Sequence, residues 1–344
     1  MREITITAND AGRRLDRFLR KYLPGASLGE VYKIIRKDVK VDSKRKSESH
    51  MLSEGETLTL YLSDEALAEF GAPDPAGSAA AIRPRGKRQS GPGVAVVYED
   101  EAILIANKPF GLLTHGDSRE KKDHLANRVK DRLIAEGAYD PRNEKVFAPA
   151  PANRLDRNTT GLVLFGKTAA AMRGLNRIIR EDEVRKFYLT IACGEIAEEL
   201  HLSGGLTKDE VANRVTVTEA DAEGARKIAT IARPLEVLRF GDGLTATLCE
   251  VELLTGRTHQ IRAHLASAGH PLIGDIKYAG PQSRRINRYV KERFGLTTQL
   301  LHACRLEFAK DTSDAEGLGY LAGRSFEAAP PERFKEILKG LKKD

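Results

Sequence analysis

Extended segments that follow one another with few intervening helices limit how the second half of this chain can fold. They occupy residues 187–192, 213–217, 227–238 and 244–254. The first of them is almost continuously apolar, as expected of a buried strand. Runs of strands with few helices between them are typical of an α+β fold. The sequence therefore predicts an α+β domain with a mixed or mostly antiparallel sheet.

This domain is predicted to begin near Val94 and to extend to Asp344. Its other expected elements are strands at 94–98, 103–106, 162–165 and 304–308, and helices at 125–136, 169–180, 257–267 and from Pro331 onwards.

Residues 1–62 are predicted to form a smaller unit with strands at 2–7, 39–41 and 57–60. Its first helix is indicated by apolar residues at helical spacing: Ala11, Leu15, Phe18, Leu19 and Tyr22. Its second helix is indicated by Ser27 and Glu30, which have the spacing of a capping box.

Residues 63–93 are predicted to be a flexible linker between the two domains. Glycine, proline and alanine dominate its first half, and basic residues dominate its second half. Such a composition buries little apolar surface.

Composition narrows the class of partner. The net charge of +7 and the pI near 9.2 favour a polyanionic partner.

Three cysteines, Cys193, Cys249 and Cys304, are too widely spaced for a metal site and suggest a reducing compartment. Because no apolar run has the length of a membrane span and the N-terminus lacks an apolar signal region, we expect a cytoplasmic protein.

The loop at residues 153–161 has neither helical nor strand periodicity, and it leads into the apolar run 162–165. Asp156 lies in it between Arg154 and Arg157. The carboxylate could serve a turn by bonding backbone N–H groups, or it could perform chemistry on a loop held by a rigid scaffold.

The same tetrapeptide occurs at residues 14–17, where it provides an internal comparison. There the helical spacing places Asp16 beside the apolar stripe, on the polar side of the helix. The copy at 154–157 lacks such periodicity, so its aspartate needs another explanation.

Three segments together resemble the RluA-type RNA pseudouridine synthases. They are the loop at 154–157 with Thr160 and Gly161, the segment 186–189 with Gly194, and the most specific one, 256–265 continued by 269–275 and Tyr278. Residues 301–303 and 326–330 also match the closing motif of the family. The resemblance implies a catalytic domain with a central cleft that isomerises uridine to pseudouridine without a cofactor.

Residue roles follow from this resemblance. Asp156 corresponds to the catalytic carboxylate, acting on the sugar as a nucleophile or by removing its C2′ proton. Tyr188 corresponds to the tyrosine against the detached uracil, and Arg262 to the arginine paired with the carboxylate. Arg154 corresponds to the arginine that fills the space of the flipped base. Arg257 and His259 are expected to contact the substrate.

Without the resemblance, several of these residues have ordinary interpretations. Tyr188 could be a core tyrosine, and Arg262, which lies off the apolar stripe of its predicted helix, could lie on the surface. His259 and His264 are five residues apart and would not share a helical face, so we expect no metal site.

The N-terminal unit resembles an S4-type RNA-binding domain, which places the chain nearest the RluC-like branch that modifies large-subunit ribosomal RNA. The residues expected to meet phosphates are Arg14, Lys33, Arg36, Lys37, Lys44, Arg45 and Lys46. The alternative is an ordinary solvated basic face. Ribosomal RNA is the expected partner, and we expect a monomer.

The chain departs from the family at Asn153, where histidine is usual, and at Thr160, where serine is usual. The segment 119–150 is also longer than expected. Alternatives left open are a synthase acting on transfer RNA and a non-catalytic RNA-binding ribosome-assembly protein. A glycosidase is disfavoured because these motifs lack a second catalytic carboxylate.

Overall fold

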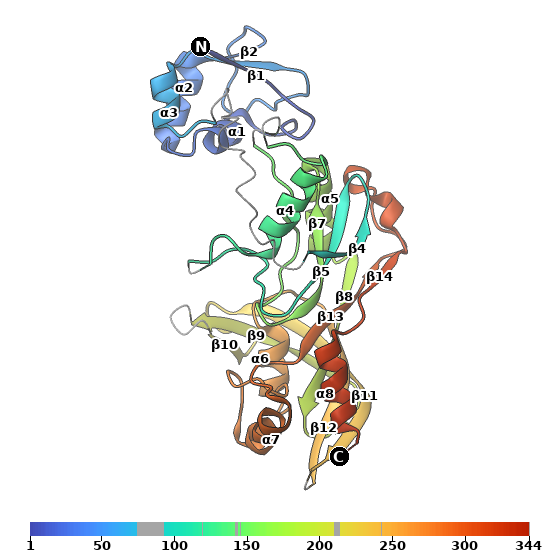
Figure 1. Cartoon of the computed structure of the whole chain (residues 1–344). Coiled ribbons are helices and arrows are strands. Elements are labelled where there is room, and N and C mark those ends of the chain that lie inside the picture. The colour runs from blue at the N-terminus through green and yellow to red at the C-terminus, as the bar shows by residue number, and fades with distance from the viewer. Residues whose placement is uncertain are drawn as a thin grey trace. The chain divides into compact units, whose positions relative to one another are not determined.

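A computed structural model describes residues 1–73, 93–118, 120–141, 144, 146–209, 214–241 and 243–343 (Figure 1). The chain divides into two compact units. The first comprises Met1–Gly93, Arg128–Ala150 and Gly166–Arg173, and the second comprises Val94–Asn127, Pro151–Phe165 and Gly174–Asp344.

In the first unit, an antiparallel sheet in the order β1-β3-β2 packs with helices. The predicted capping box forms: Glu30 donates its N–H to the Ser27 hydroxyl, and the Glu30 carboxylate accepts the Ser27 N–H at 2.7 Å. This fixes the start of the second helix. The elements are β1 (Arg2–Thr5), α1 (Leu15–Tyr22), α2 (Leu28–Asp38), β2 (Val39–Val41), β3 (Thr57–Leu60) and α3 (Asp64–Glu69).

The core of this unit includes residues from outside the predicted boundary of 62. Helix α3 forms at the start of the predicted linker, and its Leu67 is fully buried in the core. Val146, from the long segment 119–150, packs in the same core. The remaining linker residues 74–92 lie outside the described residues.

The prediction that Asp16 lies on a polar helix face is wrong, because its side chain is buried. Its carboxylate accepts hydrogen bonds from Nε and Nη2 of Arg14, at 3.1 and 2.8 Å, and from the Arg17 N–H at 2.7 Å. These bonds satisfy the charge, which allows burial beside Leu15. The carboxylate at this first copy of the tetrapeptide therefore anchors the helix start.

The second unit confirms the predicted α+β fold with a mixed sheet. Among the described residues, the sheet has eleven strands, nine of them in the order β10-β9-β11-β12-β8-β13-β7-β5-β4, with β14 beside β13 and β6 beside β7. The strands are β4 (Ala95–Glu99), β5 (Ile103–Lys108), β6 (Ala150–Pro151), β7 (Thr160–Gly166), β8 (Val184–Cys193), β9 (Leu200–Asp209), β10 (Arg214–Thr218), β11 (Arg226–Phe240), β12 (Leu244–Leu253), β13 (Leu301–Phe308) and β14 (Ser325–Glu327).

Five further α-helices follow in the described chain, and some differ from the prediction. They are α4 (Leu125–Ala135), α5 (Ala169–Arg180), α6 (Gln260–Ser267), α7 (Arg284–Phe294) and α8 (Glu332–Leu341). Helix α6 begins at Gln260 rather than at 257, because His259 before it is left-handed, with φ of 55°. Strand β9 and helix α7 were not predicted. None of the described helices is long and apolar enough to cross a membrane.

Strand β7 holds the end of the loop that carries Asp156. All its residues are buried, and it runs parallel to β13, with Thr160 opposite His302 and Gly161 opposite Ala303. Gly161 has φ of +109°, and a Cβ atom there would overlap the Ala303 carbonyl oxygen. Only glycine permits this approach of the two backbones.

We predict that Gly161→Ala lowers the free energy of unfolding of the second unit by at least about 2 kcal/mol, because it combines a strained φ with a backbone clash. Urea unfolding measures the loss. Gly280→Ala is the matched control, since Gly280 has φ of −114° and open space at its Cβ position. Equal small effects of the two substitutions would contradict the account.

Candidate active site

A cleft of about 990 Å³ lies in the second unit. Its walls come from segments far apart in the sequence: residues 113–117, the loop 151–157, the turn 256–262 and strand β8. The predicted site residues Arg154, Asp156, Tyr188, Arg257, His259 and Arg262 all line this cleft. The fold thus brings together every site residue predicted in this unit.

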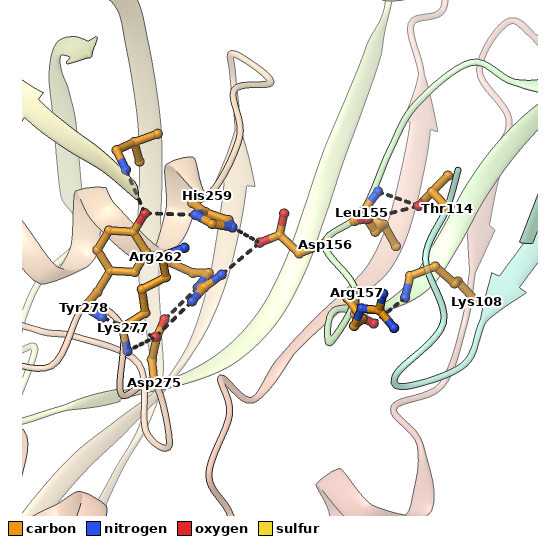
Figure 2. Close-up of polar contacts among 11 residues, drawn as sticks. Lys108, Thr114, Leu155, Asp156, Arg157, His259, Arg262, Asp275, Lys277 and Tyr278 are labelled. Carbon is orange, nitrogen blue, oxygen red and sulfur yellow. Dashed lines mark hydrogen bonds and ion pairs between the residues drawn. The ribbon is translucent and has the colours of Figure 1, made fainter. Parts of the chain in front are cut away.

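The guanidinium of Arg262 bridges two carboxylates (Figure 2). Its Nε and Nη2 donate to Oδ2 and Oδ1 of Asp275, at 2.6 and 3.0 Å, and its Nη1 donates to Oδ2 of Asp156 at 3.2 Å. Asp275 is itself buried, 1% exposed. Asp275 therefore holds Nε and Nη2 of the arginine, and Nη1 is left to bond Asp156.

The expectation that Arg262 could lie on the surface is wrong, since the residue is only 6% exposed. Burial alone lowers the pKa of Arg262, but the bonds to Asp275 and the charge of Asp156 outweigh it and raise the pKa. The ring of Tyr278 also lies 5.0 Å from the guanidinium. A buried cation with these partners stabilises negative charge on Asp156.

His259 approaches the same oxygen of this carboxylate as Arg262 does (Figure 2). Its Nε2 lies 3.7 Å from Oδ2 of Asp156, and its Nδ1 lies 2.9 Å from the hydroxyl of Tyr278. Burial lowers the pKa of His259, although the charge of Asp156 raises it. His259 therefore favours the neutral form in this setting.

Tyr188 projects from β8 and is 5% exposed where it lines the cleft. Burial, then the nearby charge of Asp156, raises the pKa of its phenol, so the group stays protonated at neutral pH. The hydroxyl makes no hydrogen bond within the part of the chain that the structure describes. A protonated phenol and its ring are thus available to a molecule in the cleft.

Backbone anchors hold the Asp156 loop on both sides. Lys108 is fully buried, and its Nζ donates to the carbonyl oxygens of Leu112 and Arg157, at 2.7 and 3.0 Å, and more weakly to that of Pro109. Burial lowers the pKa of Lys108 to about 7. The Thr114 hydroxyl donates to the Leu155 carbonyl and accepts the Leu155 N–H. No sequence pattern had pointed to Lys108 or Thr114.

Both departures from the family have local partners. The side-chain oxygen of Asn153 accepts the N–H of Leu164 at 2.8 Å, which ties the loop to strand β7. The Thr160 hydroxyl lies 2.8 Å from Nδ1 of His302, whose Nε2 lies 2.9 Å from the Ala328 carbonyl. A serine hydroxyl could make the same bond as Thr160.

The remaining predicted residues are mostly exposed. Arg154 and Arg257 are exposed at the cleft. In the first unit, Arg45 donates to the carbonyl of Arg36 at 2.8 Å. This bond brings the basic turn at residues 44–46 against α2. The basic residues left exposed on this surface are Lys33, Arg36, Lys37, Lys44 and Arg45, while Lys46 is half-buried and Arg14 is paired with Asp16.

The two other histidines of residues 256–275, His264 and His270, bond different groups. His264 Nδ1 bonds the Thr230 hydroxyl at 3.0 Å, and His270 Nδ1 bonds the Cys193 carbonyl at 3.0 Å. Within the described ranges, no group of three or more His, Cys, Asp or Glu side chains could hold a metal ion.

Comparison with known proteins gives consistent results. A sequence model of the family described as RNA pseudouridylate synthase matches residues 102–267. Ribosomal large subunit pseudouridine synthase C of Escherichia coli K12 is 31% identical over 308 residues, covering 89% of this chain and 88% of that protein. The protein of the same name in Vibrio cholerae is 31% identical over 313 residues, covering 90% of each.

Among solved structures, human RNA pseudouridylate synthase domain containing 4 superposes with a TM-score of 0.54 at 20% identity. The match covers 73% of this chain and 93% of that chain. It supports the fold assignment.

We predict that the two carboxylates bound to Arg262 contribute unequally to stability. Asp275→Asn should lower the free energy of unfolding by about 3 kcal/mol, since it breaks a buried pair. Asp156→Asn should cost under about 1 kcal/mol, because that side chain is 23% exposed and makes one longer bond. Urea unfolding of both variants tests the ranking, and equal losses would contradict it.

Proposed function

Since the chain belongs to the RNA pseudouridylate synthase family, we propose that it isomerises specific uridines of large-subunit ribosomal RNA, with Asp156 as the catalytic carboxylate. The family makes the protein an isomerase. The ribosomal target is supported by the names of relatives that cover most of its length. The observation that carries the residue assignment is the pairing of Asp156 with buried Arg262 inside a cleft.

The reaction requires the N-glycosidic bond to break, the uracil to turn, and its C5 to bond the sugar, with the C5 proton finally lost. Asp156 would either add to the anomeric carbon or remove the C2′ proton of the sugar. In either case its charge changes during the reaction. Arg262 is placed to stabilise that change at 3.2 Å.

The substrate base must leave its stack, at a cost of roughly a few kcal/mol. Arg154 is exposed beside Asp156, where its guanidinium could take the place of the flipped base. Tyr188 lies deeper, on β8, where its ring could contact the detached uracil. Arg257 borders the same cleft and could contact a phosphate.

The first unit would supply RNA affinity as an S4-like domain. Support comes from its exposed basic residues on α2 and the adjoining turn, and from the net charge of +7. We further propose that the enzyme acts as a monomer in the cytoplasm, where ribosomal RNA is found.

We predict that Asp156→Asn and Asp156→Ala abolish pseudouridine formation while RNA binding stays within about twofold, because the carboxylate serves chemistry rather than affinity. Carbodiimide mapping of ribosomal and transfer RNA after incubation with each variant measures formation and separates the two possible substrates. Pseudouridine formation by Asp156→Ala would refute the assignment of the catalytic residue.

We predict that the triple substitution of Lys33, Arg36 and Lys37 by Glu weakens rRNA binding and flattens its dependence on log salt by about 0.7–0.9 for each phosphate that is no longer neutralised. Modification of a short stem-loop should change little. The charge-matched control is Lys335→Glu with Lys339→Glu on α8 and Lys343→Glu just after it, since all three lysines are exposed. An equal change of slope in the control would argue against a recognition surface on α2.

A further inference from the structure

The hydroxyl of Tyr278 has two partners whose chemistry fixes its hydrogen. The N–H of Val215 donates to this oxygen at 3.1 Å, so the oxygen acts there as an acceptor. Its second contact is Nδ1 of His259 at 2.9 Å. If the hydroxyl donates to Nδ1, every polar hydrogen of the group is used; if Nδ1 carried a hydrogen, the phenol hydrogen would have no acceptor among these partners.

These contacts favour Nδ1 of His259 as the acceptor, which assigns the hydrogen of the neutral ring to Nε2. Nε2 is the atom that faces Oδ2 of Asp156, at 3.7 Å. This distance is longer than a hydrogen bond, as is common for catalytic contacts before substrate binds. The ring thus presents an N–H dipole, rather than a lone pair, to the carboxylate.

On these contacts, which rest on the proposed function of the cleft, we propose that Tyr278 and His259 are positioning residues for the carboxylate of Asp156. Tyr278 holds His259 as a neutral Nε2–H donor, and His259 and Arg262 together fix Oδ2. This role differs from the substrate contact expected for His259 from the sequence.

The two donors distinguish the oxygens of Asp156. Arg262 Nη1 and His259 Nε2 both approach Oδ2. Figure 2 shows Oδ2 between these groups and the other carboxylate oxygen pointing away from them. Oδ1 is consequently the oxygen left for the sugar, and the carboxylate does not need to rotate before it reacts.

The backbone places the histidine for this contact. His259 adopts a left-handed conformation, with φ of 55°, immediately before α6. The turn is pinned by Gln260, whose side-chain oxygen accepts from the Thr255 hydroxyl and the Arg257 N–H, and whose Nε2 donates to the Ala229 carbonyl. An uncommon backbone conformation held by this many bonds, beside the proposed reacting carboxylate, agrees with a functional constraint.

A neutral ring is important because a protonated His259 would form a full ion pair with Asp156 and make the carboxylate a weaker nucleophile or base. The charged groups that face His259 are Asp156 from the loop, Arg262 from α6, and Asp275 and Lys277 from the segment after α6; Arg214 of β10 lies over the Tyr278 ring. Burial lowers the pKa of His259 in this setting.

The first test compares pH–rate profiles of wild type and Tyr278→Phe in single-turnover pseudouridine formation. Tyr278→Phe keeps the ring that contacts the guanidinium groups of Arg262 and Arg214 but removes the hydroxyl. We expect the rate at pH 7 to fall roughly 2- to 12-fold, the equivalent of one hydrogen bond, and the acid limb of the profile to move to higher pH. A uniform loss with an unmoved limb would indicate a structural role only and would overturn the proposal.

His259→Gln provides the matched variant, because glutamine offers an N–H donor to Asp156 and an acceptor to Tyr278 but does not titrate. It should retain more activity than His259→Ala, and the shifted limb should disappear from the double variant Tyr278→Phe/His259→Gln. A limb that persists in the double variant belongs to another group and overturns the proposal.

A readout without RNA separates this inference from the proposed function. Two-bond ¹H–¹⁵N NMR of the imidazole should show the Nε2–H tautomer of His259 in the wild-type protein and a raised pKa in Tyr278→Phe. An Nδ1–H tautomer in the wild type would refute the positioning role even if pseudouridine forms. Absence of pseudouridine formation by the wild type would instead refute the proposed function.

Discussion

The site depends on one buried guanidinium shared between two carboxylates. Removing a cation such as Arg262 from water is costly unless charged partners and hydrogen bonds replace the solvent. Asp275 supplies the bidentate partner, and the more exposed Asp156 takes the remaining nitrogen. Because the supporting bonds come from the interior, the side of Asp156 that faces the cleft stays available. Asp275 therefore supports the arginine, whereas Asp156 is available for chemistry in the cleft.

Much of the fold could be predicted from local patterns. The capping box at Ser27, the paired strands β4 and β5, and helix α5 appear as expected, because each depends on residues close in sequence. Strand β9 was missed because Gly204 and Gly205 interrupt its apolar pattern. A Cβ at Gly205 would overlap the Glu219 carbonyl, so a distant backbone, rather than strand propensity, requires glycine there.

The surroundings of the site residues were harder to predict from the sequence than the secondary structure was. The resemblance to a family directed attention to Asp156, Tyr188 and Arg262, and the fold brings them to one cleft. Burial of Arg262 was missed because every residue from Gln260 to Leu265 is buried, so α6 has no polar face and the amphipathic pattern does not apply. The partner of this arginine, Asp275, lies 13 residues away and beyond a turn, where no periodicity relates the two. Asp16 was predicted to lie on a polar helix face, but its bonds to the nearby Arg14 allow the carboxylate to be buried there.

The parallel pairing of β7 with β13 also affects when the cleft can form during synthesis. The two strands meet through Thr160 and His302, which are 142 residues apart in sequence. A growing polypeptide releases the Asp156 loop from the ribosome long before β13, and until then Gly161 has no neighbouring backbone to approach. Assembly of the cleft is therefore coupled to the synthesis of β13, so a nascent chain that lacks this strand lacks the assembled site.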